Sequence, residues 1–409
     1  MWGIIDSMIK AAKRCESVSY AIREVVLPAR QLEKQGIKVI YLNIGDPNKY
    51  DFDTPTHMKE ALYEATNQGH NGYTASEGDL ELRNAIINRE KKRNKVDYEL
   101  DDVCITSGVT EGLQILLNAS LDPGEELLIP GPTYPQYSLI TRFNDAIPIS
   151  YHCIEEENWQ PDVEDIRKKI SEKTKGIVII NPNNPTGALY SKKVIKEIID
   201  IAGEFKIQVI SDEIYDDMTF DETQYATATL GKDVPVITFN GFSKVYLVPG
   251  WRMGYTLFHH SGELDEIQDA YLRIARSRLC ASSICQRACI AALKGPQDHI
   301  KKVNDKLRKR RDFSYKRLNE IEGISTAKPD GAFYIFPKID AMNSGIWQND
   351  KDFVLDLLKE AHVLVVHGSG FCSTYGKNHF RAVILPTLET LETAFNKLET
   401  FLNKRINHR

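Results

Sequence analysis

The stretch KGIVIINPNNPTG, residues 175–187, decides the fold class of this chain. Its first half is an uninterrupted apolar run, and its second half places Asn183 and Asn184 between two prolines. Proline and asparagine favour turns, so the apolar run is a short strand that ends sharply at Asn181. A strand that is apolar on both faces lies in a sheet that other layers cover on both sides. The stretch therefore predicts an α/β fold with a turn at the carboxyl end of a buried strand.

The same texture continues through residues 100–260, where short apolar runs alternate with longer amphipathic segments. This alternation is typical of a mostly parallel central sheet flanked by helices. Long charged helical segments and short strands follow, and they predict a smaller α+β domain. We expect an N-terminal arm with part of the small domain in residues 1–45, a large domain in residues 46–295, and a small C-terminal domain in residues 296–409.

The composition indicates a globular protein that acts on small molecules. Of 409 residues, 42% are hydrophobic and 27% are charged, and the net charge is -5. This balance gives no general attraction to nucleic acid or to anionic lipid, and the cationic run KLRKRR, residues 306–311, is expected to be the solvated face of a helix. The apolar runs are far shorter than the roughly 20 residues that cross a bilayer. We expect no membrane segment and a cytoplasmic location, since the first residues do not form a signal peptide.

The cysteines and histidines predict neither disulfides nor a metal site. The seven cysteines are scattered over the chain, and the ten histidines form no group. A disulfide framework is typical of short secreted chains, and structural zinc sites need ligands at short, regular spacings. We therefore expect free or packed thiols and no bound metal.

Small or polar residues end each predicted strand, and they carry the candidate chemistry because ligands bind at the carboxyl ends of strands in open α/β sheets. The segment SGVTEGL, residues 107–113, joins a strand to a helix, where free backbone N–H groups bind phosphate. In SDEIYD, Asp212 and Tyr215 come after an apolar strand. Taken alone, these two residues fit a structural role, with Asp212 as a helix cap and Tyr215 packed, about as well as a functional one.

Three cations complete the set of candidate residues. Lys244 ends the next strand, in NGFSKVYLVPGWRMGY, and Arg252 follows it in the same segment. A buried lysine loses its proton more easily and traps carbonyl compounds, and an arginine holds phosphate with two hydrogen bonds. Arg381 interrupts the apolar strand HFRAVILP, and a buried arginine needs an anion, either an internal carboxylate or that of a ligand. Together with the acid and the phenol, these groups meet the needs of pyridoxal 5'-phosphate (PLP).

The motifs NPNNPTG, SDEIYDDMTF and FSKVYLVPGWRMGY, in this order and spacing, resemble the class I and II aminotransferases of PLP fold type I. The resemblance covers nearly the whole chain. Within this family, YAIREVVLPARQLEKQG, LNIGDP and GAFYIFPKI are most similar to the microbial alanine aminotransferases. The resemblance implies transfer of the amino group from L-alanine to 2-oxoglutarate, giving pyruvate and L-glutamate, through a Schiff base on Lys244 and a pyridoxamine-phosphate form. Aspartate or aromatic amino acids as substrates, and a C–S β-lyase reaction, are the alternatives.

The resemblance also implies roles for single residues. Lys244 binds the cofactor covalently and moves the substrate proton, Asp212 binds the ring nitrogen, and Tyr215 binds the phenolic oxygen. Asn184 shares that oxygen and contacts the substrate carboxylate. The ring stacks on Tyr134. The phosphate contacts implied within the chain are Val109, Thr110, Ser243 and Arg252.

The remaining implied residues bind substrate or a second subunit. Arg381 and the backbone of Gly45 hold the α-carboxylate of the substrate, and Arg23 covers the site. Tyr73 reaches the phosphate in a neighbouring subunit, which implies a homodimer with shared active sites. Many aspartate-type members have a phosphate-binding serine where this chain has Gly241, so Ser243, directly before Lys244, is expected to share the phosphate contacts instead.

Overall fold

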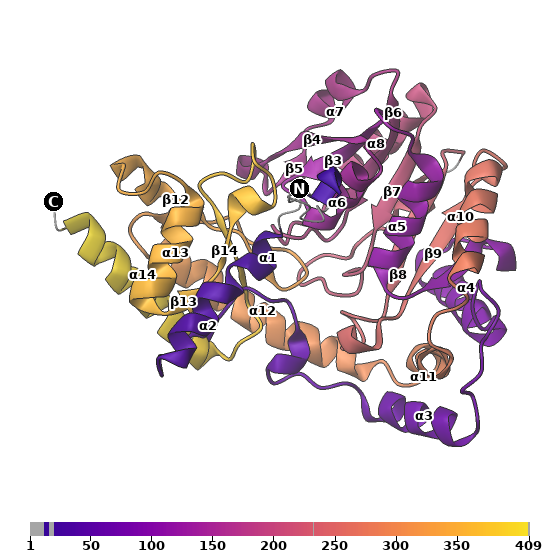
Figure 1. Ribbon diagram of the computed structural model, residues 1–409, viewed down its shortest axis with the longest axis horizontal. Coiled ribbons are helices and arrows are strands. Elements are labelled where there is room, and N and C mark those ends of the chain that lie inside the picture. Colours follow the sequence, from indigo (N-terminus) through magenta and orange to yellow (C-terminus); the bar gives the residue numbers. More distant parts are fainter. Residues whose placement is uncertain (1–11, 16–19, 232, 408–409) are drawn as a thin grey trace, which may run out of the picture.

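The structure of the protein is a computed structural model that describes residues 12–15, 20–231 and 233–407 (Figure 1). Residues 1–11 and 16–19 of the predicted N-terminal arm, and 408–409 of the predicted C-terminal domain, lie outside the described residues. An eight-stranded sheet with the order β2-β9-β8-β7-β6-β3-β4-β5 forms the larger part. Its strands are β2 (Val103–Thr106), β3 (Glu126–Gly131), β4 (Ile147–Ile154), β5 (Gln160–Pro161), β6 (Thr174–Ile180), β7 (Gln208–Asp212), β8 (Val236–Gly241) and β9 (Gly254–His259).

The sheet is mostly parallel, which confirms the predicted fold class. Strands β4, β3, β6, β7 and β8 are parallel neighbours, whereas β9 runs antiparallel to both β2 and β8. A parallel connection needs a long crossover, usually a helix. The connection from β8 to β9 has only the short 3-10 helix η5 (Pro249–Trp251), so β9 turns back and its connecting loop stays at the carboxyl end of β8.

Strand β6 shows why its sequence is apolar at every position. Ile177 and Ile179 pack into one hydrophobic cluster, and Val178 and Ile180 pack into another. Neighbouring side chains of a strand point to opposite faces of the sheet, so a strand that is covered on both faces exposes neither set. The first cluster includes α8 (Lys192–Phe205), and the second includes α5 (Val109–Ser120), α6 (Pro135–Phe143) and α10 (Asp265–Ser277).

The elements near the C-terminus form smaller sheets beside the large one (Figure 1). Strand β15 (Phe380–Val383) pairs antiparallel with both β11 (Tyr334–Ile335) and β14 (Val366–His367), and β10 (Ile324–Ser325) pairs with β12 (Lys338–Ile339). Strand β1 (Ile40–Tyr41) pairs in parallel with β13 (Val363–Leu364), far along the chain. The predicted domain limits at residues 45 and 295 stay a prediction.

The remaining helices flank these sheets. The α-helices are α1 (Ala21–Glu24), α2 (Val26–Lys34), α3 (Thr56–Asn67), α4 (Leu80–Asn94), α7 (Val163–Lys169), α9 (Thr227–Gly231), α11 (Ser283–Lys294), α12 (Asp298–Asn319), α13 (Asp350–Ala361) and α14 (Leu388–Asn407). The other 3-10 helices are η1 (Lys13–Cys15), η2 (Pro47–Lys49), η3 (Leu100–Asp102), η4 (Glu155–Glu157), η6 (Asp340–Ser344) and η7 (Gly368–Gly370). Across the described part of the chain, no helix is both long enough and apolar enough to span a membrane.

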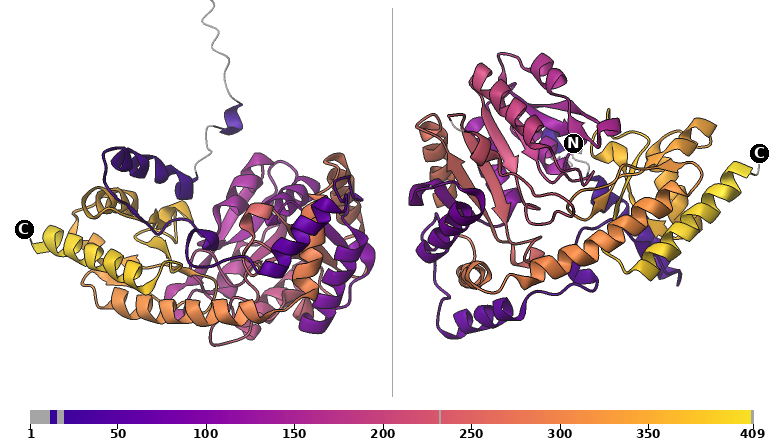
Figure 2. Two further views of the ribbon diagram at one scale, coloured as in Figure 1. Left: turned by 90° about the horizontal axis from the view of Figure 1, so that it is seen from below. Right: turned by 180° about the vertical axis from the view of Figure 1, so that it is seen from behind.

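Helix α12 runs from the side of the large sheet to the C-terminal elements (Figure 2), and it carries the run KLRKRR. The prediction of a solvated face was wrong for the end of this run, because Arg310 and Arg311 are buried. Their guanidinium groups lie 2.7 Å from the carboxylates of Asp51 and Asp221, respectively. These carboxylates come from other segments of the chain and balance the buried charges.

Candidate active site

A cavity of about 490 Å³ lies at the carboxyl ends of β6, β7 and β8. These strands are parallel neighbours, so the segments that follow them meet at one edge of the sheet. Asn184 follows β6, Asp212 ends β7, and Lys244 follows β8. The cavity is lined by every predicted site residue except Tyr73, namely Arg23, Gly45, Val109, Thr110, Tyr134, Asn184, Asp212, Tyr215, Ser243, Lys244, Arg252 and Arg381.

Lys244 presents an amine with an altered proton affinity to this cavity. Its Nζ donates a hydrogen bond to the backbone oxygen of Gly45 at 3.0 Å. Burial, which disfavours the charged form, lowers the pKa of Lys244 to about 8, and the positive charges of Arg381 and Arg252 act in the same direction. The neutral amine is the nucleophilic form. Near neutral pH, a much larger share of Lys244 is therefore neutral than of an ordinary lysine.

Asp212 is a buried carboxylate with two neutral donors. Its Oδ2 accepts a hydrogen bond from the hydroxyl of Tyr137 at 2.9 Å, and its Oδ1 accepts one from the backbone N–H of Ile214 at 3.2 Å. Burial raises the pKa of Asp212 to about 6, although these hydrogen bonds oppose the rise. A cationic N–H group that enters the cavity would stabilise the ionised form of this buried carboxylate.

Arg381 lies in the middle of β15 and is held only by neutral partners. Its Nη1 donates to Oδ1 of Asn184 at 2.9 Å, and its Nη2 donates to the backbone oxygen of Asn43 at 2.6 Å. The guanidinium carbon lies 4.6 Å and 4.8 Å from the ring centroids of Tyr334 and Phe371. Within residues 20–231 and 233–407 no carboxylate pairs with it, and its Nε has no hydrogen-bond partner. The anion that a buried arginine needs is therefore left for a ligand to supply.

The two asparagines of NPNNPTG have different surroundings. Oδ1 of Asn183 accepts hydrogen bonds from the backbone N–H and the hydroxyl of Thr186, at 3.2 and 2.9 Å, and its Nδ2 donates to the hydroxyl of Tyr190 at 3.1 Å. Asn183 therefore holds the turn itself. Asn184 instead faces the cavity, where it contacts Arg381.

The start of α5 lines another part of the cavity and is the predicted phosphate site. Gly108 precedes this helix with a φ of 81°, and a Cβ on Gly108 would lie 2.5 Å from Nη2 of Arg252. The guanidinium thus packs directly against the start of the helix, beside Val109 and Thr110. The first N–H groups of a helix lack partners within it, and a cation beside them favours a bound phosphate. Ser243 is buried and also lines this cavity.

A model of the family of class I and II aminotransferases matches residues 37–398 of this chain. The chain belongs to this family of aminotransferases. Among its relatives, it is similar to the glutamate-pyruvate aminotransferase AlaA of Escherichia coli (strain K12), with 37% identity over 97% of this chain and 98% of that protein. It is also similar to an alanine aminotransferase of Mycobacterium bovis, with 36% identity over 95% of this chain and 91% of that protein. A solved structure of an alanine aminotransferase from Pyrococcus furiosus superposes with a TM-score of 0.94 and 57% identity, covering 97% of this chain and 100% of that chain.

Aminotransferases of this family are PLP-dependent, and the residues of this cavity fit that cofactor. The start of α5, with the guanidinium of Arg252 packed against Gly108, offers backbone N–H groups and a cation to a phosphate. Asp212 offers a buried carboxylate to a protonated ring nitrogen, and Lys244 offers an amine to a carbonyl group. The fit rests on three chemically different parts of one cavity, namely the phosphate site, the carboxylate and the amine.

The aminotransferase has no room for a serine at Gly241. A Cβ there would lie 2.7 Å from the backbone oxygen of Met253 and 2.9 Å from Cα of Gly254. The cause is the close pairing of β8 with β9, in which Gly241 faces Gly254. The two nearest atoms belong to the backbone, so the rotation of a side chain cannot make room for a serine. Ser243 is the remaining serine of this segment that lines the cavity.

The N-terminal segment of the aminotransferase covers one side of the cavity. The hydroxyl of Tyr20 lies 3.2 Å from that of Tyr134, and α1 follows directly with Arg23, which is exposed and lines the cavity. Tyr73 lies elsewhere, with 82% of its surface exposed. Its predicted contact with a neighbouring subunit stays a prediction.

The cavity residues that the sequence analysis missed include Tyr137 and Tyr334, each of which bonds to a predicted site residue. Tyr137, which bonds to Asp212, lies in the first turn of α6, three residues after Tyr134, which directly precedes this helix in the same motif. Tyr334 bonds to the hydroxyl of Tyr215 at 2.9 Å. Its motif GAFYIFPKI was recognised, but no local signal marks this tyrosine as part of the site.

Proposed function

We propose that this PLP-dependent aminotransferase transfers the amino group of L-alanine to 2-oxoglutarate, forming pyruvate and L-glutamate. The reaction is supported by one observation above all, namely that the Lys244 amine and the Arg381 guanidinium line the same cavity. An α-amino acid offers its carboxylate to Arg381 and its reacting Cα to Lys244. The choice of alanine is supported by the relatives named alanine aminotransferase or glutamate-pyruvate aminotransferase, and by the 57% identity to the Pyrococcus furiosus enzyme.

Arg381 binds the α-carboxylate of the substrate. Its buried guanidinium has only neutral partners, and a carboxylate supplies the missing charge through two parallel hydrogen bonds. Asn184 and the backbone of Gly45 complete this contact. Fixing the carboxylate also fixes the direction of Cα, which lowers the entropy cost of the reaction.

Lys244 would hold the cofactor through its carbonyl carbon, and its amine would move the proton of the substrate Cα. Bound PLP supplies an electron sink that makes the Cα proton of the amino acid acidic enough to remove. The lowered pKa of Lys244 keeps Nζ ready to accept this proton and to return one on the cofactor side. Asp212 holds the ring nitrogen in its protonated state, which maintains the sink.

The other residues orient the cofactor. Tyr215 and Asn184 hydrogen-bond its phenolic oxygen, and Tyr134 stacks on its ring. The phosphate is held by the start of α5, by Arg252 and by a hydroxyl. These phosphate contacts are Val109, Thr110, Ser243 and Arg252.

We further propose that the enzyme is a homodimer with shared active sites. Tyr73 is a large side chain that is 82% exposed in the segment between α3 and α4, and Leu80, which is 59% exposed, begins α4. Exposed apolar side chains of this size gather at subunit contacts. In such a dimer Tyr73 reaches the phosphate bound by the partner. Loss of PLP affinity in Tyr73→Phe without a change in dimer content, measured by sedimentation, tests this contact.

A half-reaction screen tests the substrate. The twenty amino acids are mixed singly with the PLP form, and conversion to the pyridoxamine form is followed by absorbance. We expect L-alanine and L-glutamate to convert the cofactor fastest. If alanine fails while aspartate or an aromatic amino acid reacts, the substrate is wrong and the family assignment stands. A Lys244→Ala variant serves as the control and is expected to bind PLP without a borohydride-reducible link.

The β-lyase alternative shares the cofactor contacts and differs in its products. A β-lyase eliminates a leaving group from Cβ and needs no keto acid to turn over. We expect no pyruvate from cystathionine when no acceptor is present. Steady release of pyruvate under these conditions would replace the proposed transaminase reaction.

A further inference from the structure

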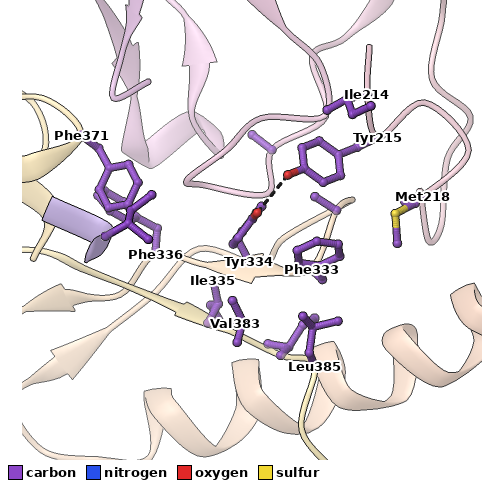
Figure 3. Packing of buried hydrophobic residues seen from close by; sticks show 14 of the residues in the cluster. Ile214, Tyr215, Met218, Phe333, Tyr334, Ile335, Phe336, Phe371, Val383 and Leu385 are labelled. Carbon is purple, nitrogen blue, oxygen red and sulfur yellow. Dashed lines mark hydrogen bonds between the residues drawn. The ribbon is translucent and has the colours of Figure 1, made fainter. Parts of the chain in front are cut away.

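A pair of tyrosines joins two walls of the cavity that come from distant parts of the chain. The hydroxyl of Tyr215, which follows β7, lies 2.9 Å from the hydroxyl of Tyr334 on β11. Figure 3 shows the two side chains pointing toward each other. Each is 3% exposed, and the rings meet edge to face with centroids 5.8 Å apart. Breaking this hydrogen bond leaves a buried hydroxyl without its partner, so the contact holds both groups in place.

Tyr334 also contacts the arginine of the neighbouring strand. Strand β11 pairs with β15, and the guanidinium carbon of Arg381 lies 4.6 Å from the centroid of the Tyr334 ring. A guanidinium over an aromatic face is attracted by the electrons of the ring. One side chain therefore touches Arg381 through its ring and Tyr215 through its hydroxyl.

A third contact limits where the Tyr334 hydroxyl can lie. A Cβ on Gly45 would be 2.5 Å from this oxygen, so the glycine leaves the room that the hydroxyl occupies. The backbone oxygen of Gly45 in turn accepts the hydrogen bond of Lys244. The Tyr334 hydroxyl is thus placed by its neighbours on both sides, between Tyr215 and Gly45.

We propose that Tyr334 is a positioning residue of the aminotransferase, which orients the hydroxyl of Tyr215 and couples it to carboxylate binding at Arg381. The inference rests on the proposed roles of Tyr215 and Arg381. When Tyr334 donates to Tyr215, the proton of Tyr215 points at the phenolic oxygen of the cofactor, and a hydroxyl that accepts one hydrogen bond donates the next more strongly. When a carboxylate binds to Arg381, it neutralises the charge that attracts the Tyr334 ring. The strength of the hydrogen bond between the Tyr334 and Tyr215 hydroxyls changes as a result.

Asn184 provides a second connection between the same two groups. Its Oδ1 accepts a hydrogen bond from Arg381 at 2.9 Å, and its amide is proposed to reach the phenolic oxygen. Part of the coupling therefore persists without the Tyr334 hydroxyl. The proposal concerns the part that is lost when this hydroxyl is removed.

The test is a pH titration of the absorbance of the holoenzyme, with and without propanoate, a carboxylate that has no amine to react. The variants are Tyr334→Phe, Tyr215→Phe and the double variant. A weaker donor at the phenolic oxygen raises the pKa read from the cofactor spectrum, and we expect a rise of about 0.5 in Tyr334→Phe. The change in this pKa caused by propanoate should fall by about half, whereas the Kd of propanoate should change less than about threefold.

The double variant shows whether Tyr334 acts through Tyr215. Residues that act on one group are not additive, so Tyr334→Phe should add nothing in the Tyr215→Phe background. Equal effects in both backgrounds, or a full response to propanoate in Tyr334→Phe, would overturn the proposal. So would an unchanged spectral pKa in Tyr215→Phe. The matched control is Tyr271→Phe, because the hydroxyl of this buried tyrosine bonds to Thr256, at 2.7 Å, outside the cavity.

Two safeguards keep the outcome clear. If Tyr334→Phe does not retain PLP, Gly45→Ala displaces the same hydroxyl and replaces it in the cycle, with the same expected and contrary results for the spectral pKa alone, because the backbone of Gly45 is itself placed at the substrate carboxylate. The titrations need bound cofactor and a carboxylate but no turnover. A failure of alanine as substrate would therefore contradict the proposed function and leave the result for Tyr334 standing.

Discussion

Replacing Arg381 by leucine should separate substrate binding from cofactor binding. Arg381 is 1% exposed, and its charge has no carboxylate partner among the described residues. A substrate carboxylate would thus form a buried ion pair with it, and removing one member of such a pair costs about 3–5 kcal/mol. Since about 1.4 kcal/mol corresponds to a factor of ten, the rate constant for the alanine half-reaction divided by Kd should fall by about 100-fold to several thousand-fold.

The same substitution should affect PLP much less. Arg381 lies at the substrate end of the cavity, whereas Arg252 packs against the start of α5. We expect the Kd of PLP to change less than about tenfold in Arg381→Leu, because the phosphate contacts remain. Arg252→Leu is the matched variant, and it should show the reverse pattern, with weaker PLP binding and a smaller effect on alanine at saturating cofactor.

The assay is a stopped-flow half-reaction with alanine, combined with a fluorescence titration of the apoenzyme with PLP. Arg381→Lys serves as a third variant. It keeps the charge but lacks the planar pair of donors that binds both carboxylate oxygens. Its rate constant for the alanine half-reaction divided by Kd should therefore lie between those of wild type and Arg381→Leu. Equal loss of alanine and PLP binding in Arg381→Leu would refute the assignment of this arginine to the carboxylate. So would retention of more than about a tenth of the wild-type rate constant.

Three further perturbations test single contacts of the cavity. The pKa of Lys244 lies at about 8, so capture of PLP by the apoenzyme should rise with pH around 8, as the amine loses its proton; a midpoint above 10, measured by stopped-flow absorbance, would contradict the lowered pKa. Tyr137→Phe removes a donor 2.9 Å from Asp212, so the pKa of this carboxyl should rise further above about 6 and PLP affinity should fall by up to about tenfold; an unchanged Kd in a fluorescence titration would exclude a role for this hydrogen bond. Gly45→Ala places a Cβ 2.5 Å from the Tyr334 hydroxyl, so thermal unfolding of the apoenzyme should begin at lower temperature and the spectral pKa should shift as in Tyr334→Phe; wild-type values of both would show that the loop yields without cost.

Much of the fold was predictable because local sequence and tertiary environment agree. Strand β6 reads as buried on both faces from its composition alone, and the structure places its alternate side chains in two separate clusters. The ends of parallel strands meet at one edge, so Asn184, Asp212 and Lys244 were recognisable as neighbours although they are far apart in sequence.

Charge and contact partners were less predictable. The sequence marked Arg381 as a buried cation but left open whether an internal carboxylate or a ligand balances it, and the structure shows only neutral oxygens around it. The run KLRKRR was assigned to solvent, yet Arg310 and Arg311 are buried. Arg311 pairs with the adjacent Asp312, but Asp51 and Asp221 lie more than 80 residues away in the chain from the arginines that they bind, and no local pattern contains them.

The sequence by itself determined the family, the succession of strands along the chain and the residues that follow their carboxyl ends. Turn-forming residues and apolar runs act over a few neighbouring positions, so they can be recognised without the tertiary structure. Only the tertiary structure decided the room at Gly241, the free charge of Arg381 and the bond between Tyr215 and Tyr334. Each of these depends on how β8 meets β9, or on how β15 and β11 lie against the carboxyl end of β7. Such contacts join segments whose separation in sequence carries no information about their separation in space.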